Sequence, residues 1–194
     1  MTQYKIDRRR LKHWQELNNR WPHYPPSKRT CFHEAGHVIV RHAVGGQTLW
    51  VAAAPSVEPL DIGGVCMGGE SIGYLPGNGA TTGLLAKVMT SYAGIIAECR
   101  QRHARIDAWI SKHAAGDMVN AVADETLAAK GAMLARKVIN AEWYAVERLA
   151  HMLRERRVMK GCELWPVLNG VRRTTLTGHT TQQRATPCPH ATPS

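Results

Sequence analysis

The sequence predicts a mainly α-helical domain with a small β-sheet inserted after the first long helix. Two observations predict this fold class. Apolar residues recur every three or four positions through several long stretches, as in amphipathic helices. Strand-like composition is confined to two short stretches that follow the first of these helices. The 194 residues suffice for one domain that buries its own core.

The first long helix is predicted from Ser27 to about Val44. Ser27 is a typical N-cap residue, and the two prolines before it favour an extended approach to the helix. Gly45-Gly46 is expected to end the helix. Its apolar positions share one spacing and should form a single buried stripe: Phe32, Ala35, Val38, Ile39 and Ala43.

Two strands should follow this helix. Residues 48–54 read as a strand that Pro55 closes, and a second short strand or hairpin is expected near residues 64–67, within a glycine-rich stretch. Three further helices are then predicted over 83–103, 113–130 and 132–157, with a break near Gly131.

The expected organisation is a basic N-terminal extension (residues 1–26), a central domain (residues 27–160) and a flexible C-terminal tail (residues 161–194) rich in Thr, Pro and Arg. The formal net charge of +10 comes from the two ends, with +6 over residues 1–30 and +4 over residues 141–194. Residues 31–140 are neutral, which argues against phosphate binding in the central chemistry. The basic runs at 8–12 and 154–160 lack interleaved aromatic residues, so we expect solvated ends rather than nucleic-acid binding.

The five cysteines include no C-x-x-C pair and do not suggest a disulfide framework, so we expect a reduced, cytoplasmic protein. The sequence begins without the apolar stretch of a signal peptide. No apolar run approaches the roughly 20 residues that span a bilayer, and we expect no membrane partner.

Residues 33–37 read His-Glu-Ala-Gly-His, an H-E-x-x-H sequence within the first predicted helix. Residues four apart on a helix project to the same side, so His33 and His37 can bind one Zn²⁺ ion together. Glu34 lies at the edge of that side, where it can act as a general base without being a metal ligand.

A catalytic zinc needs a third protein ligand and one open position. Four downstream side chains have suitable chemistry, and composition does not choose among them: Glu98, His103, His113 and Asp117. Glu98 and Asp117 both lie on predicted helices.

The HEAGH run, with Cys31-Phe32 before it and Val38-Ile39-Val40 after it, resembles the peptidase domain of the FtsH-type AAA zinc metalloproteases. Residues 93–98 (AGIIAE) are similar to the G-G-R-x-A-E-E element of that family. Residues 114–118 (AAGDM) are similar to its G-A-x-N-D element. The sequence departs from the family at Ala93, Ile95 and Cys99, and the likeness covers roughly residues 28–135.

The resemblance implies a zincin-like helical peptidase fold, with Asp117 as the third zinc ligand and Glu98 as a residue that orients a ligand. It implies a zinc-dependent endopeptidase that cuts flexible or unfolded polypeptides. Family members also carry an ATPase module and form hexameric rings. This sequence contains no G-x-x-x-x-G-K-[ST] run. We therefore expect ATP-independent cleavage, or a partner ATPase in trans, and a homo-oligomer is a further possible assembly.

Two function classes stay open at this stage. One is the zinc peptidase, in which substrate would add a strand beside residues 49–54. The other is a non-catalytic adaptor or nucleic-acid-associated protein built on a peptidase-like fold, which the basic ends would favour. The presence of Glu34 beside the two histidines favours the peptidase, because a purely structural metal site has no need of a base.

Overall fold

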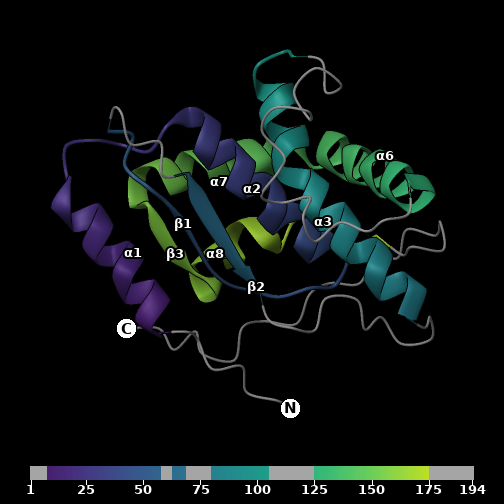
Figure 1. The fold of residues 1–194 in the computed structure, drawn as a ribbon, viewed down its shortest axis with the longest axis horizontal. Coiled ribbons are helices and arrows are strands. Elements are labelled where there is room, and N and C mark those ends of the chain that lie inside the picture. Colours follow the sequence, from purple (N-terminus) through teal and green to yellow (C-terminus); the bar gives the residue numbers. More distant parts are fainter. Residues whose placement is uncertain (1–7, 58–62, 69–79, 105–124, 175–194) are drawn as a thin grey trace.

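The computed structural model describes residues 8–57, 63–68, 80–104 and 125–174. These residues form a mainly helical fold with one small antiparallel sheet (Figure 1). With the labels of Figure 1, the elements in chain order are α1 (Arg8–Arg20), α2 (Lys28–Ala43), β1 (Thr48–Ala53), β2 (Gly64–Gly68), α3 (Ala80–Gln101), α6 (Glu125–Ala141), α7 (Trp143–Arg156), β3 (Val158–Lys160) and α8 (Gly161–Leu168).

Helix α2 lies at the centre of the fold and begins as predicted. The hydroxyl oxygen of Ser27 accepts a hydrogen bond from the backbone N–H of Thr30 at 3.0 Å, which caps the first turn. Gly45 follows the helix with a φ of 83°, a conformation that glycine adopts without steric cost. Helix α2 contacts α3, α6 and α7 as well as both β1 and β2, so most of its side chains are buried.

Within the described ranges the sheet has three strands in the order β2-β1-β3, one more than the sequence predicted. The additional strand, Val158–Lys160, directly follows the stretch 132–157, over which a helix was predicted. Arg157, with a φ of 65°, ends α7 just before it. Val51 of β1 lies opposite Cys66 on one side and Met159 on the other. Strand β1 is therefore central, and the expectation that substrate could pair along residues 49–54 is wrong because both edges are occupied.

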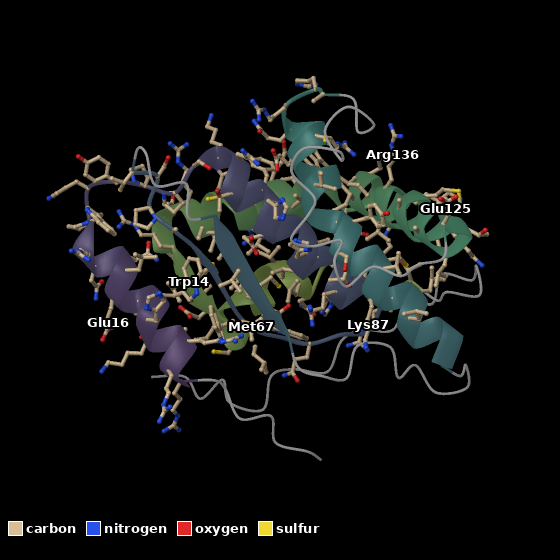
Figure 2. The ribbon with its side chains drawn as sticks, viewed as in Figure 1. Trp14, Glu16, Met67, Lys87, Glu125 and Arg136 are labelled. Atoms are coloured by element: carbon tan, nitrogen blue, oxygen red, sulfur yellow. The ribbon has the colours of Figure 1, made fainter. Side chains whose placement is uncertain are left out.

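The two faces of the sheet follow the two-residue period of a strand. Val51 and Ala53 face the main helical core, whereas Trp50 and Ala52 face α1. Helix α1 therefore covers one face of the sheet and α2 packs on the other (Figure 1). Figure 2 shows Trp14 on the side of α1 that is turned toward the sheet, where it joins the apolar cluster that includes Met67.

Part of the basic N-terminal extension is thus an ordered helix. Its C-terminal end is held by Arg157, whose guanidinium donates to the backbone carbonyls of Asn18 at 3.2 Å and Trp21 at 3.0 Å, and to that of Pro22. These carbonyls lie at and just beyond the end of the helix, where backbone acceptors lack partners within the helix. The positive charge of Arg157 also suits the negative end of the helix dipole.

The later helices differ from the prediction in where they break. The predicted break near Gly131 is wrong, because α6 runs through it without interruption and ends at Ala141. A Cβ atom at Gly131 would lie 2.4 Å from Cγ1 of Val88, so this glycine allows α6 to approach α3 closely. The helix expected over 83–103 is present as α3. Of the helix expected over 113–130, residues 113–124 lie outside the described residues.

Residues 161–168 are not a flexible tail. They form α8, whose Leu164, Val167 and Leu168 are buried in the main core. Further along, the backbone N–H of Thr174 donates to the carbonyl of Ala43 at 2.8 Å. The rest of the expected tail, residues 175–194, lies outside the described residues. Within the described ranges, no helix is long and apolar enough to cross a lipid bilayer.

Candidate metal and catalytic site

His33 and His37 lie one turn apart on α2 and turn their rings toward each other. The ring centroids are 4.8 Å apart and the rings are nearly perpendicular, at 73°. The two Nε2 atoms are separated by 3.1 Å. His37 is buried, whereas the side chain of His33 is 21% exposed. The pair thus presents two nitrogen atoms to one point at the border of the core.

The Nδ1 atom of each histidine faces away from the pair and contacts an oxygen atom on α3. Nδ1 of His37 lies 2.7 Å from the backbone carbonyl oxygen of Thr90. A carbonyl only accepts hydrogen bonds, so this Nδ1 carries the proton. Nδ1 of His33 lies 3.4 Å from Oε2 of Glu98. If the proton of His33 also lies on Nδ1, toward the Glu98 carboxylate, the two Nε2 atoms are both acceptors that face each other.

Two acceptor nitrogens at this distance call for a proton or a cation between them. Tetrahedral zinc with nitrogen ligands at about 2.0–2.1 Å places those nitrogens about 3.3 Å apart. The observed separation of 3.1 Å is close to that value. Metal-ligating histidines typically donate the other ring N–H to a carboxylate or a backbone carbonyl, and here Nδ1 of His37 contacts a carbonyl at 2.7 Å and Nδ1 of His33 lies 3.4 Å from a carboxylate. These residues therefore fit two positions of a zinc site.

Gly94 on α3 provides the space in which the two Nε2 atoms meet. A Cβ atom at Gly94 would lie 2.5 Å from Nε2 of His33 and 2.5 Å from Nε2 of His37. Because the Cα–Cβ bond of a helical residue tilts toward the N-terminus of the helix, such a side chain would also cover the turn that contains Thr90. Any residue other than glycine at position 94 would displace the imidazoles.

Gly36, inside the HEAGH run, brings the backbones of α2 and α3 together. A Cβ atom there would lie 2.5 Å from the carbonyl oxygen of Ala93 and 2.8 Å from Cβ of Ala97. Because the two helices lie so close together, Nδ1 of His37 on α2 can contact the backbone carbonyl of Thr90 on α3. Gly36 therefore allows α2 and α3 to pack closely, whereas His33 and His37 form the histidine pair.

Glu34 lies on a different side of α2, against β2. The residue is 4% exposed, and a Cβ atom at Gly64 would lie 2.5 Å from Cγ and 2.8 Å from Oε1 of Glu34. The glycine of β2 thus makes room for the carboxyl group between the helix and the sheet. Helix α2 thus holds the Glu34 carboxyl group against the sheet, while the histidine pair on the same helix faces α3.

Glu98 lies behind His33, in an almost fully buried position with 2% of its side chain exposed. Its Oε1 atom lies 2.7 Å from Nε of Arg29 and 3.8 Å from NH1 of Arg102. A buried carboxylate is costly without such partners, so the two arginines stabilise its charged form. Glu98 reaches the Nδ1 side of His33, which suits a residue that orients a ligand.

Among the described residues, no third candidate ligand joins the histidine pair in a metal-binding group. Within the ranges that the structure describes, no three His, Cys, Asp or Glu side chains lie together as a metal-binding group. Asp117 and His113 both fall outside those ranges. His103, the other candidate, lies just beyond α3 with a φ of 54° and lines a separate pocket with Cys31 and Phe32.

Three cysteines, of which Cys31 and Cys99 are buried and Cys66 is partly buried, have raised pKa values. Burial raises the pKa of Cys66 to about 12, and burial likewise raises the pKa of Cys31 to about 12. Burial also raises the pKa of Cys99, to which the charge of Glu98 contributes. Because the thiolate is the form that binds metal or attacks substrate, these cysteines are poorly suited to either role near neutral pH.

Sequence reasoning identified the histidine pair, Glu34 and Glu98, and it missed the residues that position them: Arg29, Gly64, Thr90 and Gly94. One signal was present for Arg29, which precedes His33 by four residues and so shares its side of the helix. Thr90 contacts His37 through its backbone carbonyl, which every residue has, so the residue type at position 90 could not predict this contact. No model of a known protein family matches this chain, and no curated protein matches it.

Proposed function

We propose that this protein is a zinc-dependent endopeptidase whose site is built on the HEAGH turn of α2. The observation that carries the proposal is the pair of Nε2 atoms that face each other at 3.1 Å, each with its Nδ1 atom turned to an oxygen on α3. His33 and His37 would hold the zinc ion, and Asp117 is the third ligand that we propose. The zincin-like character of the fold belongs to the same proposal.

Zinc bound there would supply a Lewis acid that polarises the peptide carbonyl and lowers the pKa of a coordinated water to about 7. Glu34 accepts a proton from the attacking water at one carboxylate oxygen and returns it to the amine nitrogen that leaves. Glu98 and the Thr90 carbonyl keep the proton of each imidazole on Nδ1, so that both rings remain fixed as ligands.

The outer edge of β2 is where we propose that the substrate lies. Among the residues that the structure describes, β2 is an edge strand, because the sheet order is β2-β1-β3. It also passes Glu34 at Gly64, so a peptide paired with this edge would run close to the proposed base. Main-chain pairing places few demands on substrate sequence and suits flexible or unfolded polypeptides.

The setting that we propose is the cytoplasm. The described cysteines Cys31, Cys66, Cys99 and Cys162 are all free thiols, which suits a reducing compartment. The sequence has no nucleotide-binding G-x-x-x-x-G-K-[ST] run, so cleavage of unfolded chains would proceed without ATP bound to this chain. A partner ATPase would be needed only for folded substrates.

The test is hydrolysis of casein in the presence of zinc and the absence of ATP. We expect the wild type to cleave casein and Glu34→Gln to lose activity by about 100-fold or more, since the amide cannot accept the proton. Glu155→Gln, an exposed change of the same kind on α7, is the matched control and should keep full activity. Equal cleavage by wild type and Glu34→Gln would contradict the proposal.

A further inference from the structure

A pocket that neither His33 nor His37 lines lies between the start of α2, the end of α3 and α7. Its volume is about 380 Å³, which is within the range of small-molecule sites. Lys28 lines it from the first turn of α2, Arg100 from the last turn of α3 and Arg154 from α7. The fold therefore brings residues that are far apart in the sequence to one cavity. Lys28 belongs to the basic stretch 1–30 and Arg154 to the basic stretch 141–194.

The charge that faces this pocket is strongly positive. Lys28, Arg100 and Arg154 each carry a full positive charge, and Glu147 is the one acidic side chain among the described residues that line the cavity. In the part of the chain that the structure describes, neither Lys28 nor Arg154 forms an ion pair. The positive end of the α2 dipole lies beside Lys28 and adds to the same potential. The excess of about two positive charges matches one dianion.

Aromatic side chains form the apolar wall of the pocket and hold one of the cations in place. The rings of Phe32 and Trp143 stack with centroids 5.5 Å apart. The guanidinium of Arg100 lies over the Trp143 ring, 4.4 Å from its centroid, and NH1 of Arg100 donates to the side-chain oxygen of Asn140. Arg100 is thus positioned before any ligand arrives, which reduces the entropy cost of binding.

We propose that this pocket binds a small phosphate monoester. The phosphate group would accept charge-assisted hydrogen bonds from Lys28, Arg100 and Arg154, and the organic part would pack against Phe32 and Trp143. A phosphate monoester carries about −1.5 to −2 charges at pH 7, which balances the pocket, whereas a carboxylate carries one. The proposal does not depend on peptidase activity.

The experiment is isothermal titration of the full chain at low ionic strength with inorganic phosphate, phenyl phosphate and benzoate. We expect phenyl phosphate to bind with 1:1 stoichiometry, more tightly than inorganic phosphate because its ring contacts the aromatic wall. Arg154→Gln should weaken the binding of phenyl phosphate about tenfold. Arg136→Gln removes the same charge from an exposed position of α6 (Figure 2) that does not line the pocket, and should bind like the wild type.

Three results would overturn the proposal. They are no binding of phenyl phosphate at about 10 mM, equal affinity in Arg154→Gln and Arg136→Gln, and benzoate binding as tight as that of phenyl phosphate. Circular dichroism checks that each variant folds. If Arg154→Gln does not fold, Lys28→Gln at the exposed first turn of α2 makes the same comparison, with the same expected loss.

Discussion

The imidazoles of His33 and His37 owe their orientation to two different oxygen atoms on α3. One belongs to the buried carboxylate of Glu98, and the other is the backbone carbonyl of Thr90. Gly94, one turn after Thr90, leaves the space in which the two imidazoles meet, because a Cβ atom there would lie 2.5 Å from both Nε2 atoms. The geometry of the site therefore depends on a residue without a side chain.

Replacing Gly94 tests this dependence directly. Gly94→Ala places a methyl group 2.5 Å from both Nε2 atoms, so we expect zinc affinity to fall at least about 100-fold, as measured by titration calorimetry. Gly170→Ala is the matched control, because the nearest atom to its Cβ lies at 3.8 Å. Zinc affinity should be unchanged in that variant. Wild-type affinity in a folded Gly94→Ala protein would refute this role.

His42, near the end of α2, gives the fold a pH dependence independent of the proposed site. Burial lowers the pKa of His42 from 6.5 to about 4, and the charge of Arg173 contributes. Between these two pH values the unfolded chain binds the proton and the folded chain does not. Stability should therefore fall as the pH drops from about 6.5 to 4, by up to about 3 kcal/mol.

Urea denaturation at pH 7 and at pH 5 measures this effect. His42→Gln removes the titrating group, and the difference in unfolding free energy between the two pH values should shrink accordingly. His151→Gln, an exposed histidine on α7, should leave that difference unchanged. If the wild type and His42→Gln lose the same stability on acidification, His42 is not the group responsible.

Among the elements, α2 was the most predictable and the later helices were the least. The serine cap, the apolar spacing and the glycine pair locate both ends of α2 within a residue or two. The helix break predicted near Gly131 was wrong because a glycine inside a helical pattern can mark either the end of the helix or a close contact with another helix. The local sequence does not distinguish these two cases. Here a contact with Val88 on α3 requires it.

Strand β3 and helix α8 were missed for a different reason. A strand of three residues has no detectable period, and its pairing with β1 connects residues more than a hundred positions apart. Helix α8 is also short, and its helical spacing is hard to separate from the Thr- and Pro-rich sequence that follows. Both elements depend on tertiary contacts that local sequence does not reveal.

Truncating Leu164 tests whether α8 belongs to the domain. Leu164 is fully buried in the main core, so Leu164→Ala should lower the free energy of unfolding by about 2–5 kcal/mol. Cys162→Ala changes an exposed residue of the same helix and should stay within about 0.5 kcal/mol of the wild type. Denaturant unfolding measures both variants. A Leu164→Ala protein as stable as the Cys162→Ala control would mean that α8 does not contribute to the core.

For the molecule as a whole, one central helix links the sheet to the helical bundle. Helix α2 places the histidine pair against α3 and Glu34 against β2, so the proposed base and the proposed ligands point to different neighbours from a single rigid element. The motif in the sequence specified these residues and the helix that carries them. It did not specify the strand that receives Glu34 or the glycines that make room for the side chains.

Zinc titration is the measurement that tests the central claim most directly. Calorimetry of metal-free protein should show one zinc ion bound by the wild type, with binding lost in His37→Gln and kept in Glu34→Gln. Zinc should also raise the thermal midpoint of the wild type, since a ligand that binds only the folded state stabilises it. Failure of the folded wild type to bind zinc, or undiminished binding by His37→Gln, would contradict the assignment of His33 and His37 as metal ligands.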